Sequence, residues 1–189
     1  MTRRSVLAAT LTGIVIVPAS ASLHVAPRLL WNETASVPVG LYRVQPDSAL
    51  HVGDIAALRL PDRLALLLAQ RGYLPFGVPL LKPVAALPGQ SVCRTKSDIS
   101  VDGVHVGNAL DSDHRGRPLL VWQGCHRLLP DEIFVMNPAE PRSLDGRYFG
   151  PLPTASVIGR AVPVWITTGR AEPLSYEMPS PVLLPPPLQ

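Results

Sequence analysis

The sequence contains few lysines, few aromatic residues and few charged residues overall. Charged residues make up 16% of the 189 residues and aromatic residues 5%, and among the 17 basic residues only Lys82 and Lys96 are lysines. Beyond Arg3 and Arg4 the basic residues do not cluster, whereas a nucleic-acid-binding surface needs a stripe of them. Despite the net charge of +3, we therefore expect no nucleic-acid partner.

Motifs for metal chemistry are missing as well. The chain has no Cys-x-x-Cys and no His-Glu-x-x-His, and its five histidines form no ligand pattern. It also lacks a Gly-x-Ser-x-Gly elbow. The sequence therefore predicts a protein without a metal site and without a cofactor.

Long stretches without proline are scarce. The 22 prolines divide the chain into short pieces, and each interior proline breaks a helix or removes a ladder hydrogen bond. The longest proline-free interval, residues 89–117, has the pattern of strands and turns. A helical bundle, a coiled coil and a multi-pass membrane protein are thereby excluded. We expect a mainly β fold, with an antiparallel sheet of short strands and one short helix.

The N-terminus has the pattern of an export segment. Arg3 and Arg4 precede an apolar run at residues 6–17, and small residues follow at 19–21. The uncharged stretch 5–23 would span roughly 28 Å as a helix, barely the apolar core of a bilayer. This pattern predicts either a membrane anchor or a cleaved signal peptide, both of which deliver the following domain across the membrane. A buried core helix is the remaining alternative.

Composition divides the chain into three parts. Residues 1–25 form the anchor or signal segment, and residues 26–172 have the length of one compact domain. Residues 173–189 contain six prolines in 17 residues, which predicts a disordered or polyproline-like tail.

One helix and several strands are predicted for the domain. Asp62 suits a first turn and Gly72 a left-handed stop, so residues 61–72 predict a helix. Alternating residues around Asp102-Gly103 predict a hairpin with a type I′ turn. Besides this hairpin at residues 99–106, strands are expected at residues 41–44, 54–60, 80–86, 119–122, 132–136 and 157–165. Pro163 predicts that the last strand lies at a sheet edge.

The two cysteines, Cys93 and Cys125, fit an exported domain. In an oxidising compartment two cysteines more often pair than stay free, and closing this loop would stabilise the fold by roughly 3 to 4 kcal/mol. We expect a disulfide between them. Two buried thiols are the alternative.

Lys82 is unusual because it lies in an apolar segment, with no other charged residue between Arg71 and Arg94. Burial of its amine would lower the pKa of the lysine, and an amine that is neutral near pH 7 can act as a general base. The alternative is a lysine whose stem is buried while its amine reaches solvent.

Two polar segments contain side chains that could work with such a base. Ser36 stands just before a proline-fixed turn, which presents its hydroxyl from a stiff backbone, and the Thr34 hydroxyl and the Ser36 N–H could stabilise an oxyanion. Further along, Asp145 and Arg147 can form a bidentate pair on one face of an extended chain, and Ser143 can hydrogen-bond an amine. Taken singly, each segment has a simpler explanation, as a turn serine and as a structural salt bridge.

Together and in this order, the three segments resemble the type I signal peptidase family of membrane-bound serine proteases. The likeness to its serine box lies at residues 34–38, to its lysine box at 82–92 and to its third box at 143–150. Within the family the sequence is most similar to the conjugal-transfer (TraF-type) peptidases. Their serine box reads Asn-x-Thr-x-Ser-x-Pro-x-Gly-Leu-Tyr, which residues 32–42 meet in full.

Four departures separate the sequence from housekeeping members of that family. Val37 replaces the usual methionine, Pro83 the usual arginine, and Gln90 stands where aspartate is common. The Gly-Asp-Asn run that precedes the third box in those members is reduced to Met136-Asn137-Pro138. These differences point away from a general leader peptidase, but they leave Ser36 and Lys82 in place.

The resemblance implies an antiparallel, signal-peptidase-like β fold, with Ser36 as the nucleophile and Lys82 as its base. It also implies three supporting roles. Ser143 would orient the amine, and Asp145 with Arg147 would brace the wall beside it. Thr34 and the Ser36 N–H would stabilise the oxyanion.

By this likeness the protein is expected to be a serine endopeptidase that cleaves an exported precursor, namely a conjugative pilin precursor, on the periplasmic side of the inner membrane. Its partners would be that polypeptide and the membrane, and it would be periplasmic if its leader is removed. The alternatives are a housekeeping leader peptidase and a non-catalytic periplasmic β module of a conjugation apparatus.

Overall fold

The computed structural model describes residues 28–46 and 48–167, together with residues 3, 5, 6, 10–12 and 14. Most of the anchor or signal segment expected at 1–25, and the whole tail expected at 173–189, lie outside the described residues. Within the part of the chain that is described, no helix is long and apolar enough to cross a membrane.

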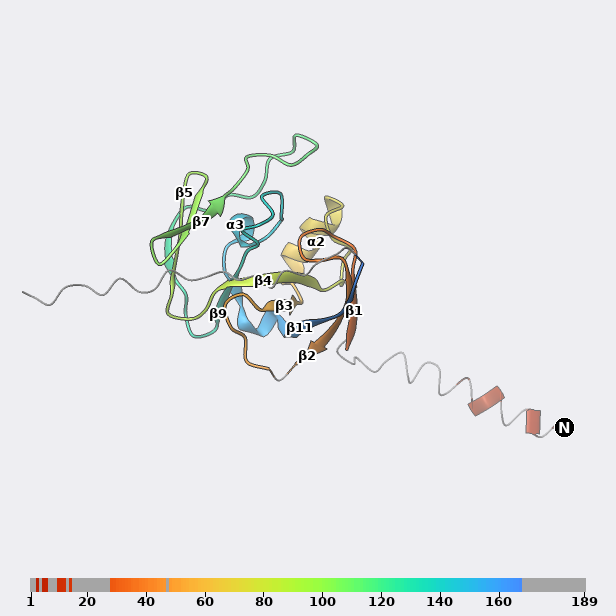
Figure 1. Ribbon diagram of the computed structural model, residues 1–189. Helices are drawn as coiled ribbons and strands as arrows, with labels where there is room; N and C mark the ends of the chain where they lie inside the picture. Colours follow the sequence, from red (N-terminus) through yellow and green to blue (C-terminus); the bar gives the residue numbers. More distant parts are fainter. Residues whose placement is uncertain are drawn as a thin grey trace, which may run out of the picture.

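The described chain forms two antiparallel sheets (Figure 1). The larger has seven strands in the order β1-β2-β11-β3-β4-β9-β10, and the smaller has four in the order β7-β6-β5-β8. This arrangement confirms the expected mainly β, antiparallel fold class.

The larger sheet contains β1 (Leu29–Asn32), β2 (Gly40–Gln45), β3 (Ile55–Leu58), β4 (Leu80–Ala86), β9 (Glu132–Val135), β10 (Leu152–Pro153) and β11 (Val157–Ile166). The smaller sheet contains β5 (Ser91–Thr95), β6 (Asp98–Val101), β7 (Val104–Asn108) and β8 (Gly124–Arg127). The helical elements are α2 (Asp62–Gln70), α3 (Gly146–Phe149) and the 3-10 turn η1 (Thr154–Ser156).

Strand β4 lies deep in the larger sheet, between β3 and β9. Six of its seven residues are buried, so it reads as a nearly continuous apolar run with a lysine in its middle. One core cluster gathers around Leu58, Leu68 and Leu80. A second forms around Val37 and Tyr42, next to the start of β2.

The helix predicted at residues 61–72 is confirmed as α2. Asp62 lies in its first turn, Leu68 faces the core, and Gly72 follows with a φ of 68°. A left-handed residue in this position ends a helix at little cost only if it is glycine.

The predicted hairpin is also confirmed. Strands β6 and β7 are joined at Asp102 and Gly103, which have φ angles of 48° and 79°. Positive φ at both central residues is what a type I′ turn requires. Cys93 and Cys125 face each other across β5 and β8 and are joined by the expected disulfide.

The strand expected at residues 119–122 is wrong, because the strand that pairs with β5 begins at Gly124. Residues 119–122 do not pair with a neighbouring strand, and polar groups of this segment hydrogen-bond to distant parts of the fold instead. The Leu120 carbonyl accepts a hydrogen bond from Arg94, and the indole of Trp122 donates to the Gly146 carbonyl at 3.0 Å.

The prediction that the last strand lies at an edge is wrong as well. Strand β11 pairs with β2 on one side and with β3 on the other. Its pairing with β3 stops at Arg160, so Pro163 lies where only β2 is a neighbour, next to a register shift. A missing N–H is tolerated there because one side of the strand is locally unpaired.

Candidate active site

The loop between β1 and β2 carries Ser36, and the side chain of Asn32 shapes this loop. The Asn32 amide nitrogen lies 2.7 Å from the Thr34 carbonyl oxygen, 2.9 Å from that of Val37 and 3.1 Å from that of Pro38. Asn32 is 8% exposed, so these bonds are shielded from water. No interpretation of the sequence gave Asn32 a role of its own.

Ser36 and Thr34 are in direct contact, with 2.8 Å between their hydroxyl oxygens. The Thr34 hydroxyl donates to the amide oxygen of Asn32 at 3.1 Å. Because a hydroxyl has one proton, Ser36 is then the donor to Thr34. In this arrangement the Thr34 proton is directed at Asn32 and away from the pocket.

Lys82 lies in the middle of β4 and is 3% exposed. Its ammonium donates to the Ser143 hydroxyl at 2.8 Å, which is the contact expected for a side chain that orients the amine. Burial lowers the pKa of Lys82 from 10.5 to about 8; Asp145 opposes this shift, whereas Arg147 adds to it. Lys82 therefore does not reach solvent as a snorkelling lysine would.

Asp145 and Arg147 form a fully buried bidentate pair. The guanidinium donates from Nε to one carboxylate oxygen at 2.9 Å and from Nη2 to the other at 3.0 Å. The pair lies on a helical turn and not on an extended chain, because Asp145 is the N-cap of α3 and accepts from the Arg147 N–H. Arg147 also donates to the carbonyls of Asn137 and Pro141, which fixes the loop before the helix.

Asn137 is a second polar residue to which the sequence reasoning assigned no role, although it lies in the reduced run before the third box. Its side-chain nitrogen donates to the Ser36 carbonyl oxygen at 2.7 Å, across 101 residues of sequence. Its main-chain N–H donates to Asp145 at 3.1 Å. Asn137 thus touches both the loop of Ser36 and the buried ion pair.

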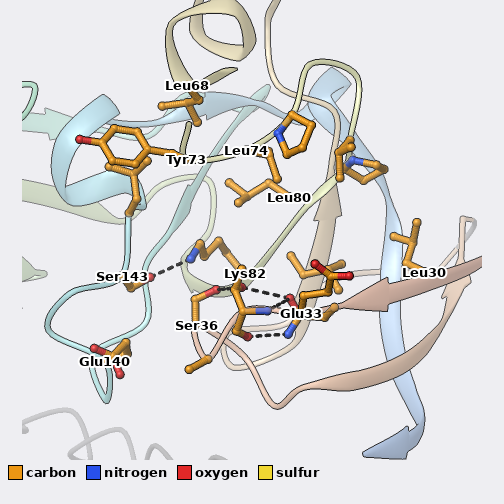
Figure 2. A pocket seen from close by; sticks show the side chains of 18 of the residues that line it. Leu30, Glu33, Ser36, Leu68, Tyr73, Leu74, Leu80, Lys82, Glu140 and Ser143 are labelled. Carbon is orange, nitrogen blue, oxygen red and sulfur yellow. Dashed lines mark hydrogen bonds between the residues drawn. The ribbon is translucent and has the colours of Figure 1, made fainter. Parts of the chain in front are cut away.

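A pocket of about 720 Å³ is lined by four of the predicted site residues, whereas Asp145 and Arg147 are buried and do not line it. Ser36, Lys82 and Ser143 all line it, and leucines, including Leu74 and Leu80, line it beside them (Figure 2). No hydrogen bond joins Ser36 to Lys82 among the described residues. The pocket therefore offers a hydroxyl and a buried amine next to an apolar surface.

Metal ligands are not gathered in the described part of the chain. Residues 28–46 and 48–167, with the few described nearer the N-terminus, contain no group of three or more His, Cys, Asp or Glu side chains suited to a metal ion. The polar lining of the pocket includes the hydroxyls of Ser36 and Ser143, the amine of Lys82 and the charged side chains of Glu33, Glu140 and Arg142.

Comparison with known proteins places the chain in a family. The family model described as "Signal peptidase, peptidase S26" matches residues 2–166. The chain belongs to this signal peptidase family, and membership implies peptidase activity of the serine type.

Curated relatives agree with this assignment. The conjugal transfer protein TraF of Agrobacterium tumefaciens is 35% identical over 144 residues, which cover 71% of this chain and 80% of that protein. The probable conjugal transfer protein TraF of Sinorhizobium fredii is 35% identical over 140 residues, covering 69% of this chain and 73% of that protein.

Among solved structures, a signal peptidase I from Enterococcus faecalis aligns with a TM-score of 0.36 at 21% identity, over 60% of this chain and 97% of that one. A superposition this loose supports no conclusion, so family membership rests on the sequence matches.

Proposed function

We propose that the protein is a Ser/Lys endopeptidase that cleaves an exported precursor polypeptide, namely a conjugative pilin precursor, on the periplasmic side of the membrane. The observation that carries this proposal is the buried amine of Lys82, with its lowered pKa, in the same pocket as Ser36. The conjugal transfer names of the relatives favour the pilin precursor over the many substrates of a housekeeping leader peptidase.

In this mechanism the Ser36 hydroxyl turns from Thr34 toward Lys82 when substrate binds. The oxygen attacks the peptide carbonyl while its proton passes to the neutral amine of Lys82. The resulting ammonium then gives that proton to the leaving amine, which departs and leaves an acyl-enzyme on Ser36. Lys82 next takes a proton from water, the hydroxide formed attacks the acyl group, and the Lys82 ammonium returns the proton to the Ser36 oxygen as the acyl group leaves.

The negative charge on the carbonyl oxygen needs donors. We assign these to the Ser36 N–H and the Thr34 hydroxyl, which turns its proton from Asn32 to the oxyanion once Ser36 has turned away. Ser143 holds the Lys82 amine from the other side, and its 2.8 Å contact stops the amine from turning out of line.

Substrate enters as an extended segment against the apolar part of the pocket. The leucines there suit the small and apolar side chains beside the cleaved bond of an exported precursor. The N-terminal export segment would hold the catalytic domain at the membrane, where such a precursor emerges.

The decisive experiment replaces each member of the pair and measures cleavage of a conjugative pilin precursor. Ser36→Ala and Lys82→Ala are each expected to lower the cleavage rate at least about 10³-fold, because either change removes a reacting group. Lys96→Ala replaces the other lysine, which lies outside the pocket, and is the matched control.

Continued cleavage by the folded Ser36→Ala or Lys82→Ala protein would refute the Ser/Lys mechanism. An intact pocket in which the wild-type Ser36 is never acylated by substrate would instead favour the non-catalytic module. Rescue of a strain depleted of its leader peptidase would favour the housekeeping role.

A further inference from the structure

Asn137 occupies an unusual position just after β9. It is 6% exposed, and its side chain reaches out of its own segment to the carbonyl oxygen of Ser36 at 2.7 Å. Its amide oxygen is occupied as well, because it accepts from the Ala139 N–H at 2.9 Å. Both ends of the side chain are therefore fixed, and the amide cannot rotate without losing two bonds.

The main chain of Asn137 is fixed on the opposite side. Its N–H donates to the carboxylate of Asp145 at 3.1 Å, and its carbonyl accepts from Nη2 of Arg147 at 2.6 Å. These two partners form the fully buried pair of α3. Asn137 is thus attached to the most rigidly bonded part of the site.

The same segment carries the contact to the base. Ser143 lies two residues before Asp145 and accepts the hydrogen bond of Lys82. Hydrogen bonds therefore join the Ser36 carbonyl to Asn137 and Asn137 to Asp145, and a short stretch of main chain leads from Asp145 to Ser143, which holds the amine.

The loop of Ser36 has little else to fix it to that wall. Residues 33–38 are shaped by the side chain of Asn32, the last residue of β1, which lies directly before the loop. Among the described residues, the bond from Asn137 is the one hydrogen bond between residues 33–38 and residues 136–147. Buried Val37 and the hydrogen bond from the Tyr42 hydroxyl to the Pro38 carbonyl at 2.6 Å hold the other side of the loop to the core. The bond from Asn137 is therefore what ties the Ser36 carbonyl to this wall.

We propose that Asn137 is a positioning residue that sets the distance between Ser36 and the amine of Lys82 by holding the Ser36 carbonyl to the wall built on Asp145 and Arg147. This inference rests on the proposed Ser/Lys mechanism. It adds that the spacing of the pair is fixed through the main chain of the nucleophile, without a direct contact between the two reacting side chains. Reaction rates respond steeply to such spacing, because a displacement of about 1 Å costs about 100-fold.

The test uses the full-length protein in detergent and two variants of Asn137. Asn137→Ala removes the bond to Ser36, and Asn137→Asp keeps the shape and the bond to Ala139 but places a carboxylate oxygen against the Ser36 carbonyl. Gln123→Ala is the control, because that exposed amide holds a main-chain segment at Lys96 in the same way but outside the pocket.

Two rates are measured at the alkaline plateau, where the amine is neutral in every variant. One is acylation of the serine by a small activated carboxylic ester, which makes few contacts with the pocket. The other is kcat for a precursor peptide, recorded together with KM. Both variants of Asn137 are expected to lose about 10- to 100-fold in both rates with KM changed less than about threefold, whereas Gln123→Ala retains wild-type rates.

The pH dependence separates positioning of Ser36 from damage to the base. The charged groups that act on the Lys82 amine are Asp145, Arg147 and Glu140, and Asn137→Ala leaves all three in place. Its pH midpoint for acylation is therefore expected to equal that of the wild type. A shifted midpoint would mean that Asn137 acts through the ion pair, and would overturn the proposal.

Acylation of Asn137→Ala at the wild-type rate, or a loss confined to KM, would also overturn it. Failure of the underlying mechanism looks different. In that case Ser36→Ala is labelled and cleaves as fast as the wild type, whatever the Asn137 variants do.

Discussion

The residue that most constrains the function is Lys82, because its charge depends on pH in the range where an exported enzyme works. Its pKa lies at about 8 and not at 10.5, mainly because burial disfavours the ammonium. Below about pH 8 most molecules hold the proton and cannot accept one from Ser36. Above about pH 8 most molecules carry a neutral amine, which can accept the proton of Ser36 as the proposed base.

We therefore predict that kcat/KM rises with pH and reaches half of its plateau near pH 8. Glu140 favours the ammonium, so Glu140→Gln is expected to move the midpoint to lower pH. The measurement is a pH–rate profile for a precursor peptide between pH 5 and pH 10. A profile that stays flat from pH 5 to pH 9 would rule out a titrating amine at this position.

At this scale the sequence revealed the reacting residues better than the residues that hold them. Lys82 stood out because it is one of two lysines and lies in an apolar strand, and Ser36 because of its box. Asn32 and Asn137 gave no such signal. An asparagine in a loop has the same appearance in a sequence whichever carbonyl it bonds, and the Ser36 carbonyl is 101 residues away from Asn137.

At the scale of elements, local sequence signals were reliable where an element forms from residues that are close together in the sequence. The helix α2 and the hairpin at Asp102-Gly103 follow from turn residues and periodicity within a dozen residues. The strand pairings of Gly124–Arg127 and of β11 are set by partners far along the chain. Pro163 could not reveal that the pairing of β11 with β3 stops three residues before it, at Arg160.

The short helix α3 shows how tightly one element is fitted beside the site. An added Cβ at Gly146 would lie 2.6 Å from both the Val135 carbonyl oxygen and a ring carbon of Phe134. Neither a strand carbonyl nor a buried ring can move freely, so only glycine lets α3 approach β9 this closely. The buried pair of Asp145 and Arg147 flanks this contact on either side.

We predict that Gly146→Ala lowers the free energy of unfolding by about 1 to 3 kcal/mol through overpacking, and lowers kcat by displacing α3. Gly116→Ala is the matched control. Gly116 has a φ of 72° but no neighbour within 4 Å, so it carries only the backbone penalty, on the order of 1 kcal/mol. Urea unfolding and peptide cleavage measure both effects. Equal losses of stability and activity in the two variants would contradict a steric cause at Gly146.

At the scale of the whole molecule, the two sheets have different tasks. The core of the smaller sheet, with Val92 and Ile99, packs against Phe134 and Met136 in and after β9. Arg94 also donates to the Arg147 carbonyl at 2.5 Å. Yet no residue between 83 and 139 lines the pocket. The smaller sheet therefore packs against β9 and α3 and contributes no residue to the lining of the pocket.

This division makes a prediction about the disulfide between Cys93 and Cys125, which joins the two strands at one edge of the smaller sheet. Replacing both cysteines by serine is expected to lower the free energy of unfolding by about 3 to 4 kcal/mol, the loop-closure value for a separation of 32 residues. At a temperature where the variant is still folded, kcat and KM should stay within about twofold of the wild type, because the pocket walls are built on other strands. Thermal unfolding and cleavage of a precursor peptide at low temperature test the two halves of this prediction. A folded variant that has lost activity would show that the smaller sheet affects Ser36 or Lys82 through the contact of Arg94 with α3, and the division of tasks would have to be abandoned.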